Sequence, residues 1–300
     1  MKLKLSRKFL PLLIISLFML SCGGTKTESA NTQEASDEFD EAKSQVISQI
    51  NDVIKDLPPP SEVPYLLMAT GSDFDPSLVN GLEKADSYTN PSYKAAINLG
   101  IYTSDVGYLT SYEKAQETLN YIGVCQKLAE SLGIASAMDL RLMGRFERNL
   151  SNKDSLKILV DEIILNTNDR LNALDRMNVA GFVLTGTYME GLYLSNKLIE
   201  TYPNDLPEES RNLILEPLIK IVIDQKPALD GLIVVLEGLA EDSDIAAVLA
   251  DMKSLQTIYD SELTLVSEQI SNNTGDMVLT ADVLSSLNAQ ITKIRSKYIN

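Results

Sequence analysis

The sequence predicts an all-α protein, with a single multi-helix domain of roughly eight to eleven helices over residues 36–300. Apolar residues recur at three- and four-residue spacing through most of that range. Proline, glycine, aspartate and asparagine stand where such segments would begin or end. No run shows the apolar–polar alternation of a β-strand, and no linker-like composition divides the range, so we expect one domain.

The first helix is expected over residues 41–55. Its apolar stripe consists of Ala42, Val46, Ile47, Ile50, Val53 and Ile54. The prolines that follow at positions 58–60 end it, because proline lacks an amide hydrogen and its ring clashes with the preceding turn. A short helix over residues 64–71 comes next and is closed by Gly71, a residue that commonly ends helices.

Two Asx-Pro pairs, Asp75-Pro76 and Asn90-Pro91, are each expected to open a helix, with the first residue as cap and proline at the first helical position. Pro217 and Pro227 are expected to divide or kink the stretch that contains them. The remaining helices are expected over residues 91–109, 111–132, 136–149, 153–167, 169–201, 243–272 and 279–298.

Residues 1–21 are typical of a lipoprotein signal peptide. Basic residues precede a short apolar run, and a small residue, Ser21, ends it. The run from Phe9 to Leu20 is too short for a membrane-spanning helix, which needs about twenty apolar residues. Leu20-Ser21-Cys22 resembles a bacterial lipobox, so we expect Cys22 to be lipidated and to attach the chain to a membrane through acyl chains. An ordinary signal peptide followed by a chance cysteine is the alternative.

A flexible tether is expected over residues 22–35, beginning at the acylated cysteine. This stretch has too few apolar side chains to offset the entropy of ordering. The acidic residues 36–41 that follow are expected to start a helix, with Ser36 as its cap and acids in its first turn. The alternative is an export tag, since these residues resemble the tags of some surface lipoproteins of Bacteroidota.

Composition excludes several classes of function. The formal net charge of −16 disfavours nucleic-acid binding, and the absence of histidine excludes His-dependent triads and His-ligated metals. No glycine-rich phosphate loop or nucleophile elbow is present. Cys125 has the surroundings of a small core residue. We therefore expect no enzymatic activity, no metal and no cofactor, with a carboxylate hydrolase as the distant alternative.

Several short segments resemble one family. These are residues 61–64 (SEVP), 70–76 (TGSDFDP), 96–102 (AINLGIY) with Asp105 and Tyr108, and 189–194 (MEGLYL). They are similar to a family of uncharacterised helical lipoproteins of Bacteroidota. The resemblance implies a helical fold and a Gram-negative envelope, and it implies no activity.

These observations predict a lipid-anchored envelope protein that acts by binding. Its expected role is that of an accessory or scaffold subunit of an outer-membrane or periplasmic assembly, with a protein partner. The outer membrane is the expected location, with the periplasmic and surface faces both open. The alternative is a solute-binding lipoprotein with a tyrosine-lined pocket.

The candidate site residues are two acids and three tyrosines: Asp105, Glu190, Tyr102, Tyr108 and Tyr193. On helices, both acids share faces that are otherwise apolar or aromatic, so we expect both to be at least half buried. Tyrosine hydroxyls, or an arginine of the 136–149 helix, would then satisfy them; that helix carries Arg141, Arg145 and Arg148. A polar ligand or cation held by the acids is the alternative. Exchange to Asn or Gln is expected to cost about 1–3 kcal/mol at each acid.

Glycines predict where two central helices approach each other. Gly100 and Gly107 lie on one side of the first, and Gly181, Gly186 and Gly191 lie in the second. Each costs about 1 kcal/mol relative to alanine inside a helix, which a close helix contact would offset. Space for a ligand between the helices is the alternative.

Overall fold

The computed structural model describes residues 28–58, 62–69, 71–135, 140–149, 152–173, 176–201, 207–271 and 281–300. None of these residues lies in a β-strand, so the predicted all-α fold is confirmed. The chain divides into two compact units, Met1–Ala42 and Lys43–Asn300, and the second contains the buried core. Cys22 and the signal segment lie outside the described residues, so their lipidation and processing stay predictions.

Helix α1 (Glu28–Asp56) begins earlier than expected. The tether was expected to extend to residue 35, but residues 28–35 already belong to this helix. They contain alanine, glutamate and glutamine and neither glycine nor proline, so nothing in them stops a helix. The predicted apolar stripe is confirmed in the second unit, where Ile50 and Val53 of α1 are buried.

Helix α2 (Glu62–Ala69) is followed by an irregular segment, residues 71–81. Gly71 has a φ of +91°, a left-handed conformation that glycine adopts without strain. The helix expected at Asp75-Pro76 is wrong. The Asp75 carboxylate accepts hydrogen bonds from the backbone N–H and the hydroxyl of Ser77, which makes a turn there, and the next element is the 3₁₀-helix η1 (Leu82–Tyr88).

Five helices then build one side of the domain and its centre. They are α3 (Ser92–Ser111), α4 (Ala115–Ser131), α5 (Leu140–Arg148), α6 (Lys153–Ala173) and α7 (Met177–Glu200). Helix α6 does not end at residue 167 as expected. Its last turns are buried at Thr167, Asn168 and Leu171, and Asn168 Nδ2 donates to Oδ1 of Asn51 in α1, so tertiary contacts outweigh the weak helix propensity of this stretch.

The remaining helices form the other side. They are α8 (Glu208–Ile223), α9 (Lys226–Gly238), α10 (Ser243–Ile258), the π-helix η3 (Tyr259–Leu263), α11 (Thr264–Ser271), the 3₁₀-helix η4 (Ala281–Leu284) and α12 (Ser285–Ile299). Helix α8 continues through Pro217, whereas Pro227 lies in the first turn of α9. The single helix expected over residues 243–272 thus contains a π-helical turn.

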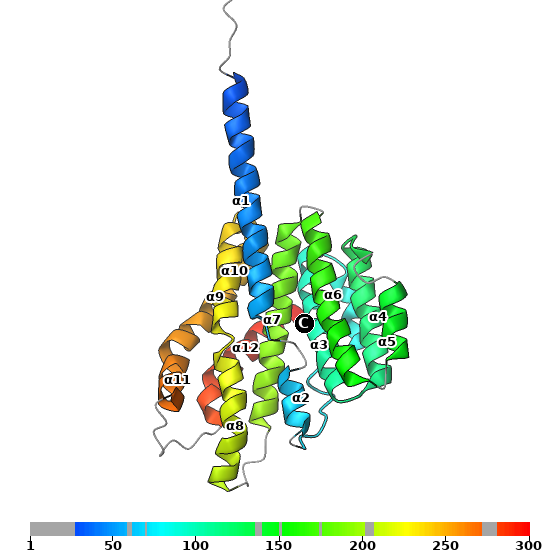
Figure 1. The fold of residues 1–300 in the computed structure, drawn as a ribbon, viewed down its shortest axis with the longest axis vertical. Helices are drawn as coiled ribbons and strands as arrows, with labels where there is room; N and C mark the ends of the chain where they lie inside the picture. Colours follow the sequence, from blue (N-terminus) through cyan, green and yellow to red (C-terminus); the bar gives the residue numbers. More distant parts are fainter. Residues whose placement is uncertain are drawn as a thin grey trace, which may run out of the picture. The chain divides into compact units, whose positions relative to one another are not determined.

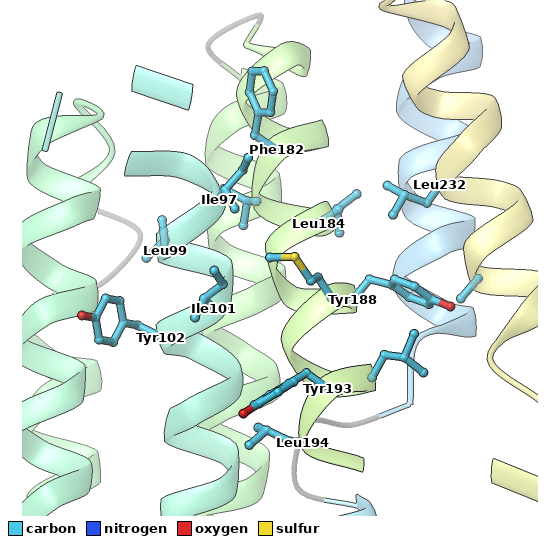
Figure 2. Packing of buried hydrophobic residues seen from close by; sticks show 14 of the residues in the cluster. Ile97, Leu99, Ile101, Tyr102, Phe182, Leu184, Tyr188, Tyr193, Leu194 and Leu232 are labelled. Carbon is cyan, nitrogen blue, oxygen red and sulfur yellow. The ribbon is translucent and has the colours of Figure 1, made fainter. Parts of the chain in front are cut away.

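Helix α7 is the centre of the domain. In Figure 1 it lies between the group formed by α3–α6 and the group formed by α8–α12, and it contacts helices of both groups. Its partner over the greatest length is α3. In Figure 2, Ile97 and Ile101 of α3 lie toward α7, whereas Leu184 and Tyr188 of α7 extend to its other side, toward Leu232 of α9, and all four are buried.

Helices α3 and α7 cross at Gly100 and Gly186. A Cβ atom at Gly186 would overlap the carbonyl oxygen of Ile97, and one at Gly100 would overlap that of Val183. The predicted close crossing is therefore confirmed at Gly100 and Gly186. Gly181 instead faces side chains of α9 and α10, and Gly191 has no atom within 4 Å of its Cβ direction, so neither takes part in it. Near the start of both helices Tyr93 packs on Phe182, and further along both the Ser104 hydroxyl donates to the Thr187 carbonyl. Helices α3 and α7 are therefore parallel.

Candidate functional site

A buried polar cluster, formed by Asp105, Glu190 and Arg295, lies one helical turn beyond the α3–α7 crossing. Asp105 follows Gly100 in α3, and Glu190 follows Gly186 in α7, so two helices that run in the same direction bring the two acids to one level. Arg295 reaches them from α12. Both acids are fully buried, which confirms the prediction that they are at least half buried.

Arg295 forms a two-pronged ion pair with Glu190. Its Nε donates to Oε2 at 2.6 Å, and its Nη2 donates to Oε1 at 2.7 Å. The guanidinium also lies over the Tyr193 ring, 4.2 Å from the centroid, where the π-electrons attract a cation. Nη2 makes one further bond, to the carbonyl oxygen of Leu78 at 3.2 Å.

The prediction that an arginine of residues 136–149 pairs with Glu190 is wrong. Helix α5, which carries Arg145, packs on α6, and Arg145 Nη1 donates to both carboxylate oxygens of Glu162 at 2.6 Å. Both of these side chains are partly exposed, at 43 % and 35 %. The sequence places an arginine on a helix but does not determine which helix faces which.

Asp105 has a different environment from Glu190. Its Oδ2 accepts a hydrogen bond from the backbone N–H of Asn80 at 3.0 Å, and its Oδ1 has no partner among the described residues. Burial and the negative charge of Glu190 raise the pKa of Asp105 well above its usual value, while Arg295 and the Asn80 N–H oppose that rise. The cluster thus favours the neutral form of Asp105.

Two tyrosines of the predicted site bind backbone atoms, and the third places its ring against Arg295. The Tyr102 hydroxyl donates to the Gly81 carbonyl at 2.6 Å. The Tyr108 hydroxyl donates to the Asp75 carbonyl at 3.1 Å and accepts from the Asp75 N–H at 2.9 Å. Tyr193 contributes its ring to Arg295. The prediction of tyrosine hydroxyls bonded to the carboxylates is therefore wrong, because an irregular segment competes for the same donors.

The cluster and the tyrosines together hold residues 78–81, the end of the irregular segment, against the interior, where Leu78 and Asn80 are buried. A buried backbone outside a helix must find hydrogen bonds for its own N–H and C=O groups. Here side chains supply them: Arg295 to Leu78, Asp105 to Asn80, Tyr121 to the Asn80 carbonyl at 2.8 Å, and Tyr102 to Gly81. We call these side chains, Arg295, Asp105, Tyr121 and Tyr102, the clasp, because they bind the backbone of residues 78–81 of the same chain.

Arg295, Asn80 and Tyr121 were not predicted as site residues. A signal for Arg295 exists in α12, where it shares one helix face with Asn288, Ile291 and Tyr298 at three-, four- and seven-residue spacing. An arginine in such a stripe predicts a buried partner of opposite charge. Asn80 gives no comparable signal, because it acts through its backbone and lies in an irregular segment.

The structure also contains an apolar pocket away from the polar cluster. It has a volume of about 260 Å³ and is lined mainly by Ile54, Leu57, Pro58, Ile164 and Leu165, from the end of α1 and from α6. None of the three predicted site tyrosines lines it. Among the described residues no cluster of histidine, cysteine and acidic side chains is arranged to hold a metal ion.

Comparisons with known proteins give no match to a family model, a curated protein or a solved structure. Within the described parts of the chain, no helix combines the length and the apolar character that crossing a bilayer requires.

Proposed function

We propose that this chain is a lipid-anchored envelope protein that acts by binding a protein partner, as an accessory or scaffold subunit of an outer-membrane or periplasmic assembly. The anchor rests on the basic and apolar residues 1–21 and on the lipobox-like Leu20-Ser21-Cys22. Acyl chains on Cys22 would hold an acidic protein at a membrane surface that its charge does not favour.

Two exposed apolar side chains of α6 are the observation that carries the binding role. Ile158 and Leu165 lie seven residues apart on one side of the helix, and they are 62 % and 50 % exposed. Leu165 also lines the apolar pocket, so the exposed side chains adjoin a concave surface. Apolar surface next to a hollow is typical of protein contact sites. Because the chain is strongly acidic, basic groups on the partner around an apolar centre would complement it.

The internal use of the polar cluster counts against the solute-binding alternative. A tyrosine-lined pocket would need hydroxyls that are free to meet a solute, whereas those of Tyr102 and Tyr108 bond to the backbone of residues 75–81. The paired acid Glu190 is likewise fully buried and bonded to Arg295.

Metabolic labelling with a palmitate analogue tests the anchor. The wild-type chain should carry the label, and Cys22→Ser should lose it and accumulate as an unprocessed precursor. A wild-type chain without label would remove the anchor from the proposal.

Affinity purification from solubilised membranes tests the binding role. The wild-type chain should retain a stoichiometric protein partner, identified by mass spectrometry, and Ile158→Glu with Leu165→Glu should lose it. Leu213→Glu is the matched control, because Leu213 is a 78 % exposed leucine on another helix, α8. A partner that stays bound to the double variant, or leaves the control equally, would exclude this face of α6.

A further inference from the structure

Two carboxyl groups and one guanidinium share the buried polar cluster, which leaves its charge unbalanced if all three ionise. The other titratable side chains that face Asp105 come from η1, α3, α4 and α7. They are Tyr88, Tyr102, Tyr108, Tyr121, Tyr193 and Cys125. Burial raises the pKa of each, so each is neutral near pH 7. Because an uncompensated buried charge is strongly unfavourable, one carboxyl group must take up a proton.

Hydrogen bonding identifies Asp105 as the acid that holds the proton. Both oxygens of Glu190 already accept from Arg295, whereas Oδ1 of Asp105 has no donor among the residues that the structure describes. A protonated carboxyl group is a donor, and the Glu190 carboxylate lies within hydrogen-bonding reach of the Asp105 side chain. Protonation therefore removes the excess charge and also satisfies a buried atom that otherwise has no partner.

We infer that Asp105 holds a proton that it donates to the Glu190 carboxylate, and that this proton closes a pH-sensitive clasp on residues 78–81. Two of the bonds that hold this stretch come from the charged cluster: Arg295 to the Leu78 carbonyl, and the Asn80 N–H to Asp105. When the proton leaves, two adjacent carboxylates repel each other and compete for a single guanidinium. The bonds to Leu78 and Asn80 then weaken together.

Hydrogen bonds also connect Asn80 to the last turn of α12. Asn80 lies next to Tyr88 and Asn98, whose side chains donate to the carbonyl oxygens of Ile299 and Tyr298 at 2.9 and 3.2 Å. Residues 73–81 lie outside any helix, and such segments open more easily than packed helices. Loss of the proton is expected to release residues 71–81 and to loosen the last turn of α12. This inference does not depend on the proposed function.

Infrared spectroscopy of the full chain tests the proton directly. The wild-type protein near neutral pH should show the carbonyl band of a protonated carboxyl group, and Asp105→Asn should lack it. Glu190→Gln should also lose the band, because Asp105 then becomes the only anion available to Arg295 and ionises. Asp251→Asn is the control that should keep the band, since the Asp251 carboxylate accepts from Lys297 and Tyr298 elsewhere. A wild-type chain without the band would overturn the inference.

Hydrogen–deuterium exchange tests the clasp. After correction for intrinsic exchange, the opening equilibrium of residues 78–81 in the wild type should rise by up to about tenfold per pH unit over the range in which the infrared band disappears. Asp105→Asn keeps the donor to Glu190 without a titrating group, so its opening should not change over that range. Equal pH dependence in both proteins, or no rise in the wild type while the band disappears, would show that the proton does not control the segment.

Discussion

Arg295 and Glu190 lie 105 residues apart in the sequence, and the Arg295 guanidinium donates hydrogen bonds to both oxygens of the Glu190 carboxylate, at 2.6 and 2.7 Å. The pair joins the last helix, α12, to the central helix, α7. The Glu190 side chain is fully buried and that of Arg295 is 7 % exposed, so water screens neither charge. The Arg145–Glu162 pair has the same chemistry at the surface, and the two pairs can be compared within one protein.

Arg295→Met is expected to destabilise the fold by about 3–5 kcal/mol, because it leaves the Glu190 charge buried beside a second acid. Arg145→Met removes the same group from the partly exposed pair and is expected to cost less than about 1 kcal/mol. Urea unfolding followed by circular dichroism measures both free energies. Similar losses in the two variants would mean that Arg295 contributes no more than a surface arginine.

Asp105→Asn is expected to change stability in a pH-dependent way, which differs from the loss of about 1–3 kcal/mol anticipated from sequence. The pKa of Asp105 is raised in the folded protein, so its contribution is complete below the unfolded value of about 3.9. As the pH rises towards the folded pKa, only the unfolded chain has lost its proton, and stability falls by up to about 1.4 kcal/mol per pH unit.

Asparagine does not titrate, so the unfolding free energy of Asp105→Asn should match that of the wild type within about 1 kcal/mol near pH 4 and exceed it increasingly above that pH. Urea titrations at several pH values measure the difference. A variant that is less stable than the wild type by a constant amount at every pH would contradict this expectation.

Gly186→Ala is expected to cost more than about 3 kcal/mol, because the new methyl group would overlap backbone atoms of Ile97 that cannot move without separating α3 from α7. Gly191→Ala is the control in the same helix. It meets no atom within 4 Å and should stabilise the protein by about 0.5–1 kcal/mol through helix propensity. Thermal unfolding distinguishes them, and a neutral Gly186→Ala would exclude the close crossing.

Cys125 is expected to resist thiol reagents in the folded protein. Its side chain is fully buried, and burial raises the pKa of the thiol to about 12, so the reactive thiolate is scarce near pH 8. Reaction with Ellman's reagent should be slow without denaturant and complete in urea. Rapid labelling of the native chain would indicate that α4 opens easily from α3.

Local patterns in the sequence determined the helical class, most helix positions and the burial of the two acids. Three- and four-residue apolar spacing marks a helix wherever it occurs, and an acid surrounded by apolar residues on one helix face is recognisable without a partner. The close approach of α3 and α7 was also predictable, since glycine inside a helix is unfavourable unless a neighbour needs the space. Each of these properties depends on residues a few positions apart.

Only the tertiary structure decided which groups meet. Arg295 pairs with Glu190 because α12 packs on α7. Arg145 pairs with Glu162 because α5 packs on α6. The Asp75 carboxylate caps a turn, and the backbone N–H and C=O of Asp75 bond to the hydroxyl of Tyr108, 33 residues away. A partly buried irregular backbone needs such partners, and a contact over this separation cannot be predicted from neighbouring residues. The energies of these contacts depend on burial and on charges contributed by distant parts of the chain. The spacing of residues along the sequence does not determine either of them.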